Sequence, residues 1–108
     1  ANGEYVKQDY KKAFYWYSLA APQGDTEAQR DLGYLYSTGL GIKRNSKVAA
    51  EWYKRAASKN DEKAFYNLGL CYKNGDGVTQ STRWAKHYFL KAVEYGHKEA
   101  KRQLKSLA

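Results

Sequence analysis

The sequence repeats itself every 36 residues without a gap, and this period limits the possible folds more than any other feature. A glycine marks the start of each unit, at Gly3, Gly39 and Gly75. Other columns with the same spacing hold alanine, aromatic residues or leucine: Ala13, Ala49 and Ala85; Trp16, Trp52 and Tyr88; Tyr17, Tyr53 and Phe89; Leu32, Leu68 and Leu104. A period of this length is typical of solenoids, in which one supersecondary unit stacks on the next. We therefore divide the chain into units 3–38, 39–74 and 75–108.

Each unit carries the signals of two helices, which we call helix B and helix A in chain order. Helix B has an apolar face at the spacing i, i+3, i+4 and i+7, formed in the first unit by Ala13, Trp16, Tyr17 and Ala20. Possible N-caps precede helix B, at Asp9, Asn45 and Ser81. Residues that tolerate a left-handed turn follow it, at Gly24, Asn60 and Gly96.

Helix A comes next in each unit, with a buried face that the first unit builds from Ala28, Leu32, Leu35 and Tyr36. Asp25 and Asp61 are its expected caps, and His97 takes that place in the last unit. Gly33 and Gly69 weaken the helix, so we expect a neighbouring helix to approach closely at both positions.

The expected helices cover residues 9–22, 25–37, 45–58, 61–73, 81–95 and 97–107. The single proline and the small β-branched content also favour helices over strands. The predicted fold is therefore all-α, a right-handed α-α superhelix (α-solenoid) of 36-residue two-helix repeats with about six helices.

The residues that recur every 36 positions closely resemble the signature of the Sel-one-like repeat (SLR) family over almost the whole chain. The matching residues of the best-formed unit are Ala28, Leu32, Gly33, Tyr36, Gly39, Gly41, Ile42, Ala49, Trp52, Tyr53, Ala56, Ala57 and Asn60. The resemblance implies a relative of the tetratricopeptide solenoids that acts as a protein-interaction adaptor. Catalytic residues are not part of this signature, so the resemblance implies that the chain is not an enzyme.

The two ends of the chain depart from the signature. Tyr5 replaces the second glycine of the first loop, and the first unit has no helix A before its helix B. In the last helix Lys105 takes the place of Gly33 and Gly69, which indicates a polar cap. We interpret residues 1–108 as a single domain, and we expect it to be the C-terminal part of a longer array.

The Gly-x-Gly element at Gly39 and Gly41 precedes a basic, aromatic helix and could be taken for a phosphate loop. It has neither the Gly-Lys-Ser/Thr ending nor the preceding strand that nucleotide loops require. Its recurrence at the 36-residue period favours a connecting turn. Cys71 falls in an apolar column and is expected in the core, while His87 and His97 form no metal constellation. The sequence therefore predicts no cofactor, no metal and no catalytic residue.

The resemblance also implies that the A helices line a concave groove. The side chains beside the buried face of these helices are the candidate partner-binding residues: Glu27, Arg30, Asp31, Tyr34, Lys63, Tyr66, Asn67, Leu70, Lys73 and Arg102. Exposed tyrosine, arginine and leucine in one groove are favourable for protein contacts. An ordinary solvated face is the alternative interpretation.

The net charge of +8 is unevenly distributed, with −1 in the first unit, +5 in the second and +4 in the third. It suggests a partner that is acidic. The leading hypothesis is a scaffold that binds another protein, whose identity the sequence does not give. The same groove could serve a toxin-neutralising or envelope-associated inhibitor, and the basic units could bind nucleic acid or an anionic surface, which is less favoured. No apolar run is long enough to span a membrane, and the single cysteine leaves the compartment open.

Overall fold

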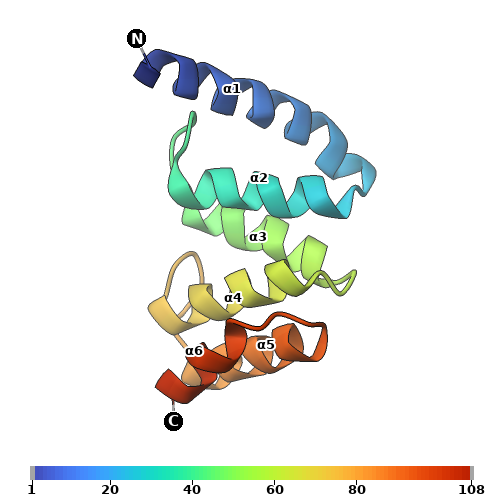
Figure 1. The fold of residues 1–108 in the computed structure, drawn as a ribbon, viewed down its shortest axis with the longest axis vertical. Helices are drawn as coiled ribbons and strands as arrows, with labels where there is room; N and C mark the ends of the chain where they lie inside the picture. Colours follow the sequence, from blue (N-terminus) through green and yellow to red (C-terminus); the bar gives the residue numbers. More distant parts are fainter. Residues whose placement is uncertain (1, 108) are drawn as a thin grey trace.

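The computed structural model describes residues 2–107, and it describes the side chains of residues 9–107. This part of the chain folds into six α-helices and one short 3₁₀ helix: α1 (Asn2–Ala20), η1 (Ala21–Gln23), α2 (Thr26–Thr38), α3 (Ser46–Ala57), α4 (Glu62–Asn74), α5 (Thr82–Glu94) and α6 (Ala100–Ser106). The helices are stacked in chain order along the long axis of a body of 44 × 28 × 24 Å (Figure 1). The predicted α-solenoid is therefore confirmed.

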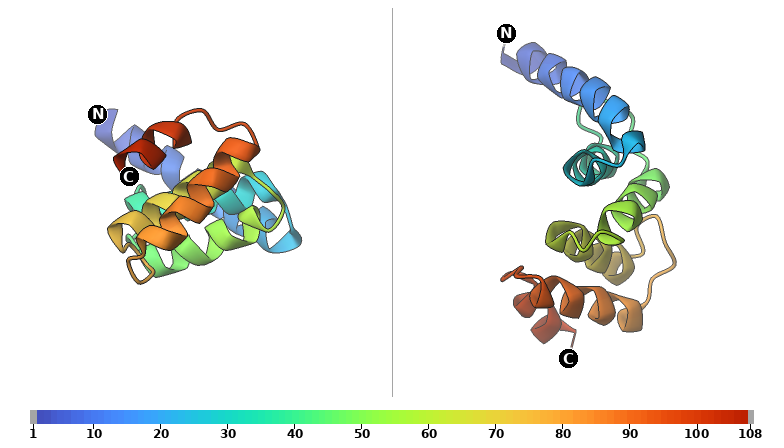
Figure 2. Two further views of the ribbon diagram at one scale, coloured as in Figure 1. Left: turned by 90° about the horizontal axis from the view of Figure 1, so that it is seen from below. Right: turned by 90° about the vertical axis from the view of Figure 1, so that its right-hand side faces the viewer.

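The helices form two layers. A view from the side shows α2 and α4 on one side of the stack and α3 on the other (Figure 2). The closest partners are α2 with α3 and α4 with α5, and each of these pairs is joined by a Gly-x-Gly loop. The A helices α2, α4 and α6 therefore follow one another along one side of the molecule, as the groove hypothesis requires.

Four of the predicted N-caps are confirmed by hydrogen bonds. Asp25, Asn45, Asp61 and Ser81 each accept a hydrogen bond from the backbone N–H three residues later, at donor–acceptor distances of 2.9, 3.1, 2.9 and 3.2 Å. The predicted left-handed turns are also present, because φ is 101° at Gly24, 65° at Asn60 and 99° at Gly96. The local signals of the repeat thus determine most of the helix ends.

Two predicted helix starts are wrong, the one at Asp9 and the one at His97. Asp9 is not a cap, because α1 begins at Asn2 and runs through it. At Asn45 and Ser81 the helix start is held by a backbone hydrogen bond to the preceding A helix, from Asn45 N–H to Tyr36 and from Ser81 N–H to Tyr72. Within residues 2–107 no A helix precedes α1, so nothing interrupts it at Asp9. The last helix begins at Ala100 rather than at His97.

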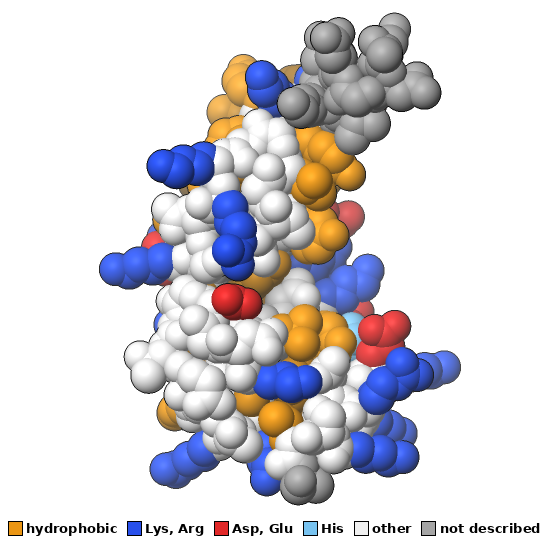
Figure 3. All heavy atoms as spheres, turned by 90° about the vertical axis from the view of Figure 1, so that its left-hand side faces the viewer, with side chains coloured by type: hydrophobic (Ala, Val, Ile, Leu, Met, Phe, Trp, Pro, Cys, Tyr) orange, Lys and Arg blue, Asp and Glu red, His pale blue; other side chains and the backbone are white. Residues whose placement is uncertain are grey.

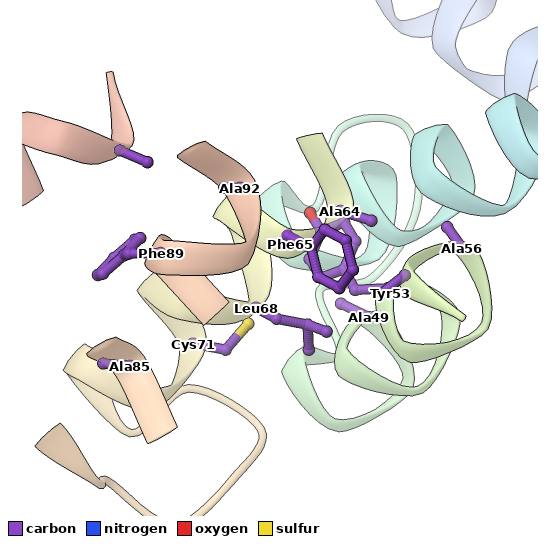
Figure 4. Packing of buried hydrophobic residues seen from close by; sticks show 12 residues of the cluster. Ala49, Tyr53, Ala56, Ala64, Phe65, Leu68, Cys71, Ala85, Phe89 and Ala92 are labelled. Atoms are coloured by element: carbon purple, nitrogen blue, oxygen red, sulfur yellow. The ribbon is translucent and has the colours of Figure 1, made fainter. Parts of the chain in front are cut away.

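The core lies between the helix layers and is built mainly from alanine and aromatic side chains. Phe89 and Leu68 are fully buried at its centre, and Figure 4 shows Phe89 from α5 and Leu68 and Cys71 from α4 within the same packed cluster. Cys71 is 7% exposed, as predicted, and burial raises the pKa of its thiol to about 11. A buried neutral thiol of this kind acts as a small apolar group.

Both helix glycines allow the close approach that the sequence predicted. A methyl group on Gly33 would come within 2.8 Å of the Tyr53 ring, and one on Gly69 would overlap the ring of Phe89. The aromatic residue of each following B helix therefore lies directly on the A-helix backbone. This contact sets the spacing of the two layers.

The Gly-x-Gly loops are connecting turns, and their second glycine makes a contact between repeats. Gly41 has φ +76° and lies against the backbone of Tyr10 and Lys11 in α1. Gly77 has φ +72° and lies against Ser46 and Lys47 at the start of α3. A side chain at either position would strain the backbone and collide with the preceding B helix, which explains the glycine without any phosphate ligand.

The expected burial of Trp16 is wrong. Trp52, at the same position of the second unit, packs against the cluster formed by Ala21, Ala28 and Leu32. The Trp16 side chain is 64% exposed, beside the exposed Tyr15 and Leu19. The equivalent Trp52 and Tyr88 are half-buried against the A helix on their N-terminal side, and within the described residues no A helix lies on that side of Trp16.

Candidate partner-binding groove

Six of the ten candidate residues line one hollow of about 400 Å³ on the A-helix side of the molecule. They come from α2 and α4, and His97 from the segment before α6 completes the lining: Arg30, Asp31, Tyr34, Lys63, Tyr66, Asn67 and His97. Arg30 and Asp31 of α2 match Tyr66 and Asn67 of α4, because α4 repeats α2 after 36 residues. Part of the lining therefore follows from the repeat geometry.

The other four candidates lie outside this hollow. Glu27 contacts the Arg30 guanidinium at 3.9 Å at its edge. Leu70 is half-buried and packs against the core. The Lys73 ammonium donates a hydrogen bond to Gln103 at 2.8 Å, which ties α4 to α6. Arg102 is exposed on α6.

One wall of the hollow is an ion-pair network around Arg30. Its guanidinium donates to the carboxylates of Asp61 at 3.1 Å and Asp31 at 3.3 Å. The Arg30 and Asp61 side chains are only 17% and 15% exposed. Burial alone would lower the pKa of Arg30, but the carboxylates of Asp61 and Asp31 outweigh this effect and raise it. Arg30 therefore holds α2 against the start of α4 as a permanent cation.

The opposite wall is an aromatic stack. The rings of Tyr66 and His97 are parallel to within 14°, with centroids 4.2 Å apart. The Tyr66 hydroxyl accepts a hydrogen bond from the Gln103 amide at 3.3 Å. His97 Nδ1 is buried and has no hydrogen-bond partner in the described part of the chain, so stacking is the contact that positions this ring.

The two walls occupy equivalent positions in successive units. Tyr66 lies 36 residues after Arg30, and His97 lies 36 residues after Asp61. An ion pair at one repeat boundary is thus replaced by an aromatic stack at the next. Sequence reasoning placed His97 at a helix start and left it out of the groove, although the joint change of these two columns is a signal that could have found it.

The hollow also offers groups that are free to meet a partner. Lys63 and Tyr34 are exposed, and Tyr34 is 49% exposed despite its size. The amide of Asn67, half-buried between them, can both donate and accept a hydrogen bond. Aromatic area combined with one amide and one cation is suited to a polypeptide segment.

A second hollow, of about 520 Å³, lies at the Gly-x-Gly loop between α4 and α5. Its lining includes Lys54, Tyr72, Val78 and the half-exposed Trp84. Figure 3 shows the side of the molecule that carries these loops, where basic side chains project along the whole length and acidic ones are few. Most of the excess positive charge therefore lies outside the 400 Å³ hollow.

Neither a metal site nor a membrane helix is found in the part of the chain that the structure describes. Within it, no three His, Cys, Asp or Glu side chains come close enough together to hold a metal ion. None of its helices is both long enough and apolar enough to cross a membrane.

Comparison with known proteins assigns the family. A family model described as Sel1 repeat matches residues 1–25, 26–61 and 62–97. The chain belongs to the Sel1 repeat family. The second and third matched units start at the A helices α2 and α4, and each contains one closely packed pair, α2 with α3 or α4 with α5. Their period agrees with the 36-residue register of the sequence. No curated protein gives a significant match.

Solved structures show the same Sel1 repeat fold. A Sel1 repeat protein from Oxalobacter formigenes is 35% identical, with a TM-score of 0.80 over 85% of this chain and 69% of that one. A protective antigen of uropathogenic Escherichia coli strains, which displays an SLR fold, is 39% identical, with a TM-score of 0.82 over 88% of this chain and 20% of the antigen. Cysteine rich protein B of Helicobacter pylori is 29% identical, with a TM-score of 0.81 over 88% of this chain and 71% of that protein.

Sel1 repeat proteins generally mediate protein–protein interactions, and they are typically non-catalytic scaffolds. This chain differs from a cysteine-rich relative in having a single cysteine, Cys71, which is free and buried. Its repeats are therefore held together by packing and hydrogen bonds, without an internal disulfide.

Proposed function

We propose that this Sel1 repeat chain binds a segment of a partner protein in the hollow between α2, α4 and His97. One observation carries the proposal: side chains predicted from the repeat register and the family resemblance converge from two A helices on the same hollow. Two of the walls are pre-organised, one by the Arg30–Asp61 ion pair and the other by the Tyr66–His97 stack. A pre-organised site loses less conformational entropy on binding.

Arg30 and Tyr66 support the fold as well as the hollow, so their replacement would mix binding with stability. Lys63 and Asn67 are better test positions, because both lie on the groove side of α4 and neither belongs to the buried core. They are also one helical turn apart, so a bound segment can contact both.

The experiment selects binders from a phage-displayed library of random dodecapeptides and measures their affinity by isothermal titration calorimetry. The double variant Lys63→Ala/Asn67→Ala should bind the selected peptides about tenfold or more weakly, the usual effect of losing one or two central contacts. The matched control is Lys86→Ala/Asn74→Ala, which removes the same two residue types at exposed positions outside the hollow. Equal affinity of the two double variants would refute the proposal.

A further inference from the structure

A third hollow, of about 190 Å³, lies between α1 and α2 and is lined by three tyrosines and one carboxylate. Tyr10, Ala13 and Tyr17 come from one face of α1, and Asp31, Tyr34 and Leu35 come from α2. At ~30 Å³ for each water in the liquid, the hollow has room for about six waters or for the end of one long side chain. It shares Asp31 and Tyr34 with the 400 Å³ hollow, so the two hollows lie side by side.

The ion-pair network beside this hollow is negative, although the chain as a whole carries a net charge of +8. Glu27, Asp31 and Asp61 all contact the single guanidinium of Arg30, which leaves an excess of two negative charges in the network. The same carboxylates act on the Tyr17 hydroxyl. Burial raises the pKa of Tyr17, and the negative charges of Asp31 and Glu27 raise it further.

Two of the three tyrosines, Tyr10 and Tyr34, are not required by the packing of the repeat. In the second unit the positions of Tyr10, Asp31 and Tyr34 hold Ser46, Asn67 and Leu70. In the second unit α3 and α4 still pack against each other, and Asp61 caps α4 as Asp25 caps α2. The scaffold therefore accepts small, neutral or aliphatic residues where the first unit has two tyrosines and a carboxylate.

We propose that the hollow of Tyr10, Tyr17, Asp31 and Tyr34 is a cation cage that receives a lysine or arginine side chain of the partner segment. Tyrosine rings attract a cation through the negative potential of their faces, and a carboxylate at the same site adds a direct ion pair. Charge complementarity decides the occupant, because the cage is the negative end of a groove in a basic protein. The cage deepens the proposed function, since it names the chemistry of one partner residue.

The test uses two small probes, N-acetyl-lysine N-methylamide and N-acetyl-norleucine N-methylamide, which differ in the terminal ammonium group that norleucine lacks. Each is titrated into ¹⁵N-labelled protein at constant ionic strength, and the amide shifts are followed by NMR. The lysine probe should shift the amides of residues 10–17 and 31–35 in a saturable way, with at least fivefold higher affinity than the norleucine probe. Equal affinity of the two probes, or shifts outside these segments only, would overturn the cage.

Three variants import the residue that the second unit already carries at each position: Tyr10→Ser, Asp31→Asn and Tyr34→Leu. The second unit folds with these residues, so the variants should keep the native fold, which their NMR spectra check. Each should weaken the binding of the lysine probe at least threefold, and Asp31→Asn should also remove the preference for lysine over norleucine. The control Asp76→Asn removes one carboxylate in the α4–α5 loop, where it pairs with Arg44 at 3.8 Å, and should change nothing. An unchanged affinity in Asp31→Asn would overturn the cage.

The cage and the groove fail separately. Selected peptides that depend on Lys63 and Asn67, together with a lysine probe that does not bind residues 10–17 and 31–35, would refute the cage alone. Saturable binding of the lysine probe at these residues, with peptides that do not depend on Lys63 and Asn67, would refute the groove alone.

Discussion

Replacing Gly69 by alanine tests whether the contact between α4 and α5 sets the spacing of the helix layers. In an ordinary helix interior this change would stabilise the protein by about 1 kcal/mol, because alanine has the higher helix propensity. Here the added methyl group meets Phe89, which is fully buried in the core. Propensity and packing therefore predict effects of opposite sign.

The magnitude follows from the geometry of the contact. The three atoms nearest to the new methyl carbon are Cδ1, Cε1 and Cζ of Phe89, so the ring must move as a whole. Overpacking a closed core costs about 1–3 kcal/mol, and the complete burial of Phe89 places this site at the upper end. After the gain in propensity is subtracted, we expect the free energy of unfolding to fall by about 2 kcal/mol. At roughly 5 °C per kcal/mol for a chain of this size, Tm should fall by about 10 °C.

Urea unfolding followed by circular dichroism at 222 nm measures this loss. The companion variant Phe89→Leu removes the ring, and the double variant Gly69→Ala/Phe89→Leu should show a coupling energy of at least ~1 kcal/mol, because the two side chains are in contact. Lys63→Ala, an exposed change in the same helix, should stay within about 0.5 kcal/mol of the wild type. A Gly69→Ala variant as stable as the wild type would refute the packing argument.

Two further predictions concern the N-caps of the A helices and the buried thiol. Asp61→Ala should lower the free energy of unfolding by about 3 kcal/mol and Asp25→Ala by about 1 kcal/mol. Both variants lose an N-cap hydrogen bond, but Asp61→Ala also removes the half-buried carboxylate that pairs with Arg30. Equal losses in urea unfolding would show that the ion pair contributes nothing. The pKa of Cys71 is raised from 9.0 to about 11 in the folded protein, so its contribution is complete below pH 9 and is lost as the pH rises through 11. We expect Cys71→Ala to flatten the fall in stability over this window by up to about 3 kcal/mol, and a wild-type fall no steeper than that of Cys71→Ala would contradict the assignment.

The groove was only partly predictable, because its walls depend on contacts between repeats. The helical register placed Arg30 and Tyr66 beside the buried face of the A helices, and the family resemblance implied that this side lines a groove. Their partners Asp61 and His97 come from the start of the next A helix, and the sequence analysis gave these residues the role of caps alone. Asp61 serves both roles, since it caps α4 and binds Arg30. His97 serves as no cap, because the last helix begins three residues later.

The sequence by itself determined the 36-residue unit, the order of the helices and the close approach at Gly33 and Gly69. These features follow from local rules of capping, turn conformation and apolar spacing, which act within a few residues. Only the tertiary structure decided the length of α1, the exposure of Trp16 and the three hollows. Each of these features depends on which helix lies beside a given face. The starts of α3 and α5 are held by a carbonyl of the preceding helix. A side chain is buried only where another element covers it.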